Sequence, residues 1–181
     1  MTEERLIKGS LEGNARVQKK LYERYSPAMY GICLRYAGNP DEAADILQEG
    51  FIKVFTRLED YRYEGSFEGW IRKIIINTAI NHLVRQKKYH GQEDLEEVQG
   101  EIYPSPSALE KLQHRDLIRL VQQLPPGYRM VFNLYEIEGY SHKEIAEMMG
   151  ISVNTSKTQL LHARRYLQRK IMETEKISVI K

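Results

Sequence analysis

Four polar side chains follow one another at intervals of four residues in the stretch FEGWIRKIIINTAINHLVRQKK: Lys73, Asn77, Asn81 and Arg85. On a helix with about 3.6 residues per turn, this spacing places them on one face. Asparagine is a poor helix former, so two asparagines one turn apart suggest amides positioned to hydrogen-bond bases. Amides flanked by cations suit a polar, anionic partner.

The segment that leads into this helix mixes aromatic and basic residues. Rings that stack on unpaired bases, next to cations that contact phosphates, are what a binder of single-stranded nucleic acid needs. The alternative is that the rings belong to the core. We favour the core for Trp70, and both interpretations stay open for Tyr61 and Tyr63. The mixed segment comprises Tyr61, Arg62, Tyr63, Phe67, Trp70, Arg72 and Lys73.

A helix–turn–helix pattern near the C-terminus is a second candidate for nucleic-acid binding. Between Ser152 and Lys170 the chain has five Lys/Arg and no acid. In such motifs the second helix enters the major groove and its N-terminal half contacts base edges, while later cations contact phosphates. A solvated helix in an unrelated bundle is the alternative. With Leu160 at the centre of the buried face, the opposite face carries Asn154, Thr158, His162, Arg165 and Arg169.

A third set of residues suits a protein partner. Asp45, Gln48, Glu49 and Ile52 lie at the rim and back of a predicted helix and combine polar and apolar side chains. Mixed surfaces of this kind are common at protein interfaces. Without further context, a plain solvated face is the preferred interpretation.

Motifs of catalysis and of metal binding are missing from the sequence. There is no glycine-rich phosphate loop, no HExxH and no pair of cysteines at metal-ligand spacing. Asp41, Asp45 and Glu49 are spaced four residues apart, but no histidine follows at ligand spacing. We therefore expect no enzyme activity, no cofactor and no metal.

The net charge of +2 conceals an uneven distribution. Residues 1–89 have 15 Lys/Arg and 12 Asp/Glu, residues 90–106 have five acids and no Lys/Arg, and residues 107–181 have 12 and eight. Two mildly basic segments thus flank an acidic one, which is relevant to nucleic-acid binding. A single cysteine, Cys33, and the lack of a signal-peptide or membrane-spanning run favour a cytoplasmic protein.

All periodic segments have helical spacing, which predicts an all-α fold. The first domain, residues 1–89, is expected to be a lobe of four helices over 2–12, 14–37, 41–58 and 67–88. Pro27 should kink or interrupt the second helix, and Ser66 is a plausible N-cap of the fourth. The expected core stripes are Ala44, Leu47, Phe51, Val54, Phe55 and Leu58 on the third helix, and Ile71, Ile75, Ala79 and Leu83 on the fourth.

Residues 90–106 have two glycines, two prolines and few large apolar side chains, and predict a flexible acidic linker. A second small helical domain, 107–181, follows, with helices over 107–123, 128–137, 142–149 and 153–172. Ser141 and Glu144 predict a capping box at the third of these helices. We expect Ile145, Ala146 and Met149 to face inward, opposite a stripe of Val153, Leu160, Ala163, Leu167 and Ile171.

Three stretches together resemble a bacterial sigma factor of the extracytoplasmic-function type. They are DILQEGFIKVF, the aromatic loop continuing into FEGWIRKIIINTAINHLVRQKK, and LPPGYRMVFNLYEIEGYSHKEIAEMMGISVNTSKTQLLHARRYL. The resemblance extends over both predicted domains, from about residue 14 to 170, in the family's order. A helix–turn–helix alone is weak evidence, but both segments in register are specific.

The resemblance implies a role for each surface. Asp45, Gln48, Glu49 and Ile52 would dock on the clamp helices of RNA polymerase's largest subunit, which replaces our preference for a solvated face. The segment from Tyr61 to Asn81 would recognise and melt the minus-ten promoter element. Asn77 would accommodate a flipped base, flanked by the loop aromatics and Lys73. The positions that match minus-thirty-five contacts in this family are Lys157, Thr158, Leu161, His162 and Arg164.

Other implications concern departures and partners. Ser156 occupies a position that is commonly apolar in the family, Gln159 one that is commonly basic, and His162 one that is frequently arginine. Family members are usually held by an anti-sigma factor, often a membrane-anchored one. Because the two domains are only mildly basic, we expect tight, specific promoter binding to need the polymerase.

Two alternatives remain from the residues alone. A DNA-binding response regulator or repressor would use only residues 139–170 and would normally dimerise, but it leaves Asn77, Asn81 and the aromatic loop without a function. A helical adaptor would bind no DNA even beside polymerase. Binding to core RNA polymerase separates these classes from a sigma factor.

Overall fold

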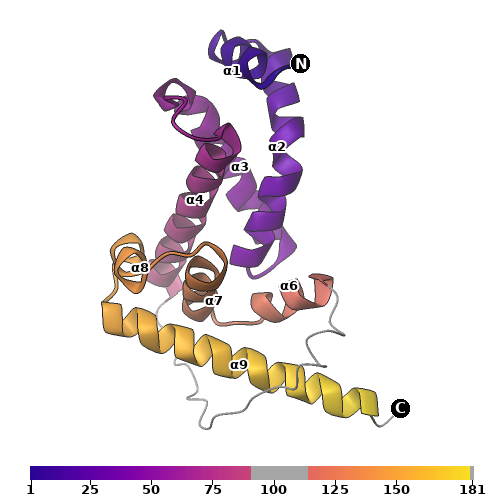
Figure 1. The fold of residues 1–181 in the computed structure, drawn as a ribbon, viewed down its shortest axis with the longest axis vertical. Coiled ribbons are helices and arrows are strands. Elements are labelled where there is room, and N and C mark those ends of the chain that lie inside the picture. Colours follow the sequence, from indigo (N-terminus) through magenta and orange to yellow (C-terminus); the bar gives the residue numbers. More distant parts are fainter. Residues whose placement is uncertain (91–113, 180–181) are drawn as a thin grey trace. The chain divides into compact units, whose positions relative to one another are not determined.

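The computed structural model describes residues 1–90 and 114–179, and the side chains of 1–86 and 116–173. Within these ranges it contains helices and turns but no strand (Figure 1), which confirms the predicted all-α fold. The chain divides into two compact units, Met1–His82 and Leu83–Lys181. Residues 91–106 of the predicted acidic linker and the predicted helix start at Ser107 lie outside the described residues.

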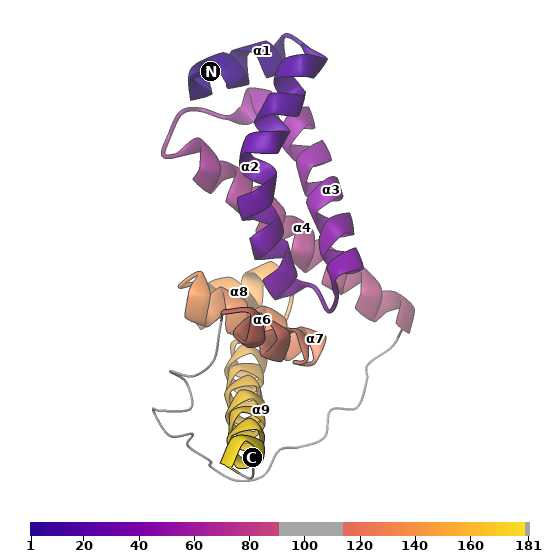
Figure 2. The same cartoon turned by 90° about the vertical axis from the view of Figure 1, so that its right-hand side faces the viewer.

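The first unit is built from α1 (Glu3–Leu11), α2 (Ala15–Tyr36), α3 (Pro40–Thr56), the short 3₁₀ turn η1 (Leu58–Asp60) and α4 (Phe67–His90). Side chains cap each of the first three helices, because Thr2, Asn14 and Asn39 accept hydrogen bonds from backbone amides of the first turn. Helices α2 and α3 pack side by side, as Figure 2 shows. The four predicted helices of this lobe are confirmed.

Pro27 does not interrupt α2, contrary to the second of the two outcomes expected for it. The helix runs on from Ala15 to Tyr36 with Pro27 inside it. Proline removes the hydrogen bond to the carbonyl four residues earlier, here that of Glu23. Both residues are exposed, so water can take the place of the missing amide.

The core of the first unit is packed closely between α3 and α4. Leu47, Phe51, Val54 and Leu58 are buried as predicted, whereas Ala44 is exposed and Phe55 is only half-buried. The buried stripe of α3 therefore keeps most of the predicted residues and also includes Ala43 and Ile46. Gly50 also lies in it. A Cβ at this position would clash with the Ile75 side chain, so the glycine permits the close approach of the two helices.

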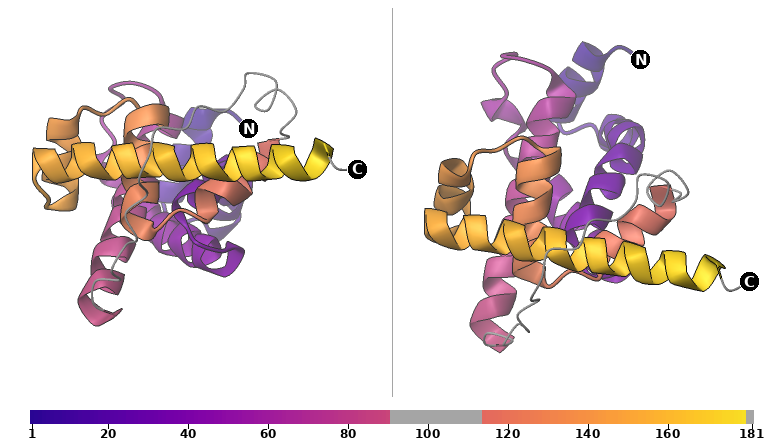
Figure 3. Two further views of the ribbon diagram at one scale, coloured as in Figure 1. Left: turned by 90° about the horizontal axis from the view of Figure 1, so that it is seen from below. Right: turned by 60° about the horizontal axis from the view of Figure 1, so that its bottom comes forward.

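The second unit has α6 (His114–Gln122), α7 (Pro126–Phe132), the π-helical turn η2 (Asn133–Ile137), α8 (His142–Met149) and α9 (Val153–Val179). Helices α7 and α8 both pack on α9, a long continuous helix in Figure 3. The predicted capping box at Ser141 and Glu144 is present. Gly150 ends α8 with φ 65°, a conformation that glycine adopts easily.

The buried stripe of α9 differs from the predicted one at its N-terminal end. Leu160, Ala163 and Ile171 are buried as expected, but Val153 is 38% exposed and Ser156 is fully buried in its place. A prediction from hydrophobicity alone places the valine in the core. In the structure α8 packs over the serine instead, and the serine hydroxyl has a hydrogen-bond partner on that helix. Among the residues described, every helix is too short or too polar to serve as a membrane span.

Candidate nucleic-acid and partner-binding surfaces

The two rows of α4 are fully separated in the structure. Ile71, Ile75, Ala79 and Leu83 are at most 5% exposed, while Lys73, Asn77, Asn81 and Arg85 are all exposed. Ser66 begins the helix in the predicted way, because its hydroxyl accepts a hydrogen bond from the Gly69 amide at 3.1 Å. The amides of Asn77 and Asn81 make no hydrogen bond to any residue that the structure describes, so they are available to a ligand.

The loop before α4 holds one of its two tyrosines inside and the other outside. Tyr61 is 8% exposed, and its hydroxyl donates to the Gly65 carbonyl at 2.9 Å. Its ring lies 5.0 Å from that of Phe67 and 5.5 Å from that of Trp70. Stacking of Tyr61 on a base is therefore not supported by the structure, because both its ring and its hydroxyl are already engaged.

Tyr63 is the accessible ring of this loop. It is 61% exposed, and its centroid lies 4.8 Å from that of Tyr61. Its φ of 60° is unusual for a residue other than glycine. Trp70 is half-buried and stacks on Phe67, in agreement with our preference for the core. The loop thus exposes one aromatic ring, Tyr63, which packs on a cluster of buried aromatic rings.

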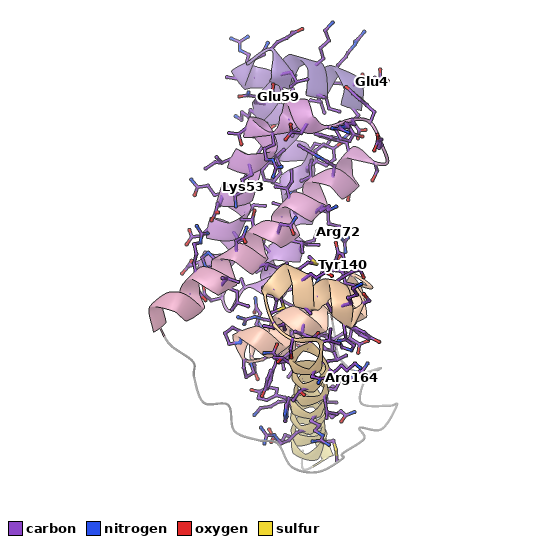
Figure 4. All side chains as sticks on the ribbon, turned by 90° about the vertical axis from the view of Figure 1, so that its left-hand side faces the viewer. Glu4, Lys53, Glu59, Arg72, Tyr140 and Arg164 are labelled. Carbon is purple, nitrogen blue, oxygen red and sulfur yellow. The ribbon has the colours of Figure 1, made fainter. Side chains whose placement is uncertain are left out.

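Three of the four candidate residues on α3 point outward. Asp45, Gln48 and Ile52 are exposed, Ile52 by 57%. Glu49 is half-buried, and its carboxylate accepts a hydrogen bond from Lys53 at 2.7 Å. Lys53, labelled in Figure 4, also donates to Thr78 of α4 at 3.3 Å. Glu49 thus helps to join α3 to α4, and the exposed surface beside it mixes a carboxylate, an amide and an aliphatic side chain.

The candidate contact residues of α9 differ in accessibility. Asn154, Lys157, Thr158, Leu161 and Arg164 are exposed, and His162 and Arg165 are half-buried. The ring of His162 stacks on that of Tyr128, with centroids 5.4 Å apart, so it lies at the edge of the core. Leu161 is 45% exposed and adds an apolar group to an otherwise polar face.

A network that the sequence did not predict links α9 to η2 and α8. Ser156 and His142 Nδ1 are 2.9 Å apart, and the His142 ring stacks on Tyr135, with centroids 4.5 Å apart. Arg164 forms an ion pair with Glu136. Burial lowers the pKa of His142, and the positive charges of Lys157 and Arg164 lower it further. Partners 14 and 28 residues apart give no periodic signal, so sequence patterns could not have found them.

Two family models match the chain over most of its length. The model of sigma-70 region 2 matches residues 21–89, and that of sigma-70 region 4 matches residues 114–167. The helical fold and the two matched regions define a sigma factor of the sigma-70 family, the class of protein that directs promoter-specific initiation of transcription.

Relatives that match over nearly the whole length identify the type. The ECF RNA polymerase sigma-E factor of Escherichia coli (strain K12) is 28% identical, covering 94% of this chain and 95% of the relative. That of Haemophilus influenzae is 29% identical, covering 94% and 96%. The chain belongs to the extracytoplasmic-function (ECF) sigma factors.

A solved structure supports the fold. The sigma factor RpoE, in complex with the anti-sigma factor NepR from Bartonella quintana, superposes with a TM-score of 0.52 at 19% identity, covering 86% of this chain and 96% of that one.

Proposed function

We propose that this sigma factor binds core RNA polymerase through α3, opens the minus-ten element with α4 and its preceding loop, and contacts the minus-thirty-five element as duplex with α9. The observation that carries the proposal is the polar row of α4. Its asparagines and cations are exposed, while the apolar row on the same helix is buried. This sorting turns the cations outward and leaves the two amides without a hydrogen bond to any residue that the structure describes.

For the minus-ten element we propose Tyr63, Lys73, Asn77, Asn81 and Arg85 as contacts. An extruded base needs hydrogen-bonding groups for its edge and a ring for its face. The asparagines offer the former and Tyr63 the latter, while Lys73 and Arg85 can contact phosphates. Tyr61 is left out of this set because it is buried. Its ring packs against that of Tyr63.

For the minus-thirty-five element we propose the exposed face of α9. Asn154, Thr158 and Leu161 can contact base edges, and an exposed leucine suits the methyl group of thymine. Lys157 and Arg165 supply charge for phosphates. His162 and Arg164 lie at the margins of this face.

For core RNA polymerase we propose Asp45, Gln48 and Ile52, with Glu49 at the rim. The division into domains 1–89 and 107–181 with a linker between them remains a proposal. One module for duplex and one for melted DNA on a single chain raise each other's effective concentration at a promoter. The chain would act in the cytoplasm, catalyse no reaction of its own and be held inactive by an anti-sigma factor.

The decisive experiment compares Asn77→Ala with Asn154→Ala in the full chain, with core polymerase. Both residues are exposed helical asparagines, so the changes are matched in chemistry. Asn77→Ala should reduce opening of the minus-ten region by about tenfold or more, as expected for the loss of one or more base contacts, while polymerase binding is unchanged. Permanganate footprinting and polymerase pulldown measure the two quantities.

Asn154→Ala should instead weaken binding in proportion to the strength of the minus-thirty-five element. Equal loss of polymerase binding and opening in Asn77→Ala would show that Asn77 is structural. Failure of the unaltered chain to bind core polymerase would contradict the proposed function as a whole.

A further inference from the structure

Arg164 of α9 is held by two side chains of another element. Its Nη2 lies 2.6 Å and its Nε 2.7 Å from one carboxylate oxygen of Glu136. Its guanidinium carbon also lies 5.9 Å from the centroid of the Tyr135 ring. Both partners belong to η2, so the side chain joins two elements of the second unit. Figure 4 labels Arg164 on α9.

The position of Arg164 around α9 agrees with this engagement. At about 100° per residue, Arg164 lies about 40° from Leu160, the buried centre of the helix. The exposed Leu161 and Thr158 lie about 100° and 160° from that centre. Arg164 is therefore at the rim of the buried stripe, next to the elements that pack on α9.

The turn that carries Glu136 is itself fixed by buried polar contacts. Asn133, fully buried, donates to the Arg129 carbonyl at 2.9 Å, and its own carbonyl accepts from the Glu138 amide at 3.0 Å. This bond spans five residues and makes η2 a π-helical turn, a feature frequent at functional sites. A carboxylate on so constrained a turn can hold an arginine in one orientation.

We infer that Arg164 is a positioning residue that fixes the orientation of α9 through Glu136, and that it is not a phosphate contact. The inference rests on the proposed function, since it concerns how the same helix is presented to the minus-thirty-five element. It assigns the phosphate contact of this face to the exposed Lys157 instead. The side chain of Glu136 is 33% exposed. In this interpretation its carboxylate neutralises Arg164, which would otherwise bind DNA without sequence preference.

The test uses the complete chain with core polymerase on a promoter fragment, at a series of salt concentrations. The variants are Arg164→Gln, Glu136→Gln, their combination, the exchange Arg164→Glu with Glu136→Arg, and the control Lys157→Gln. Promoter affinity is measured for the best minus-thirty-five element and for one with a substituted base pair. Thermal unfolding of the free chain is recorded beside it.

For a positioning role, Arg164→Gln should leave the salt dependence of binding unchanged and reduce discrimination between the two elements about two- to fivefold, the range of a partly exposed ion pair. Glu136→Gln should have the same effect, and the combined variant should be no worse than either. The exchange should restore part of the discrimination. Lys157→Gln should instead lower the slope of log affinity against log salt by about one.

A different pattern would overturn the inference. If Arg164→Gln lowers the salt slope as Lys157→Gln does, and Glu136→Gln tightens binding, Arg164 is a DNA contact that Glu136 attenuates. If the unaltered chain does not distinguish the two elements, the proposed function of α9 fails. The melting temperatures then still report independently whether Arg164 and Glu136 are coupled.

Discussion

Helices α4 and α9 are the two candidate DNA-contacting helices, and they separate their faces in different ways. On α4 every residue of the apolar row is buried and every residue of the polar row is exposed. On α9 a valine is exposed, a serine is buried and an arginine is bound by an acid of another element.

The difference follows from what each helix packs against. Ile75 of α4 contacts the α3 surface at Gly50, and the two rows of α4 follow hydrophobicity, although Thr78 between them is buried and accepts from Lys53 of α3. α9 packs against α8 and η2, which offer it His142 and Glu136. Polar partners can bury polar residues when hydrogen bonds are satisfied. Periodicity therefore identifies the outward face of α4 better than that of α9.

Replacing one residue in each row of α4 gives the largest expected contrast. Ile75→Ala removes a fully buried side chain and should lower the free energy of unfolding by about 2–5 kcal/mol. Asn77→Ala should change it by less than about 0.5 kcal/mol. Urea denaturation of the full chain measures both. If the two variants lose similar stability, the separation of faces on α4 is not what the burial indicates.

On α9, Ser156→Ala should have a smaller but clear effect. It removes the contact with His142 Nδ1 at 2.9 Å and leaves that nitrogen without its partner, which costs about 1–3 kcal/mol. Thr158→Ala, an exposed control on the same helix, should be nearly neutral. Unchanged stability in Ser156→Ala would show that the contact with His142 does not help to hold α9.

The smallest expected effect is the pH dependence of the second unit. The pKa of His142 lies below its ordinary value of 6.5 in the folded state, because of burial and of the cations Lys157 and Arg164. At a pH between the folded pKa and 6.5, His142 is protonated in the unfolded chain but neutral in the folded chain. The free energy of unfolding should therefore fall as the pH drops through about 6.5 and level off below the folded pKa.

Thermal unfolding between pH 7.5 and 5 checks this dependence, with His142→Gln as the variant in which this decrease should vanish. Glu144, on the same helix, has its pKa lowered by hydrogen bonds from Ser141. Its stabilisation is lost at more acidic pH, below its ordinary value of 4.5, and does not overlap that of His142. A decrease that persists in His142→Gln would assign the pH dependence to other groups.

The helices and their starts could largely be predicted from the sequence. Caps and breakers are local signals, so Ser66, Ser141 and Gly150 mark helix boundaries where the structure has them. The π-helical geometry of η2 was not predicted, because the sequence around the buried Asn133 has no local signal for it. The continuation of α2 through Pro27 could not be predicted for a related reason. It depends on whether the residues on either side of the missing hydrogen bond, Glu23 and Pro27, are exposed to water, which is a tertiary property.

The candidate surfaces were predicted with uneven success. The outward row of α4 follows from spacing and is confirmed as exposed. Tyr61 and Tyr63 have the same side chain two positions apart, and only the fold shows that one is buried and the other exposed. The pairing of Arg164 with Glu136 joins residues 28 positions apart, beyond any local pattern.

The missing side chain at Gly50 has a mechanical consequence. Because Ile75 occupies the space that a Cβ at Gly50 would need, α3 and α4 meet in a defined register. A partner that grips the outer face of α3 therefore also sets the location of the asparagines on α4. We therefore expect the candidate polymerase surface and the candidate DNA surface of the first unit to keep a constant spacing.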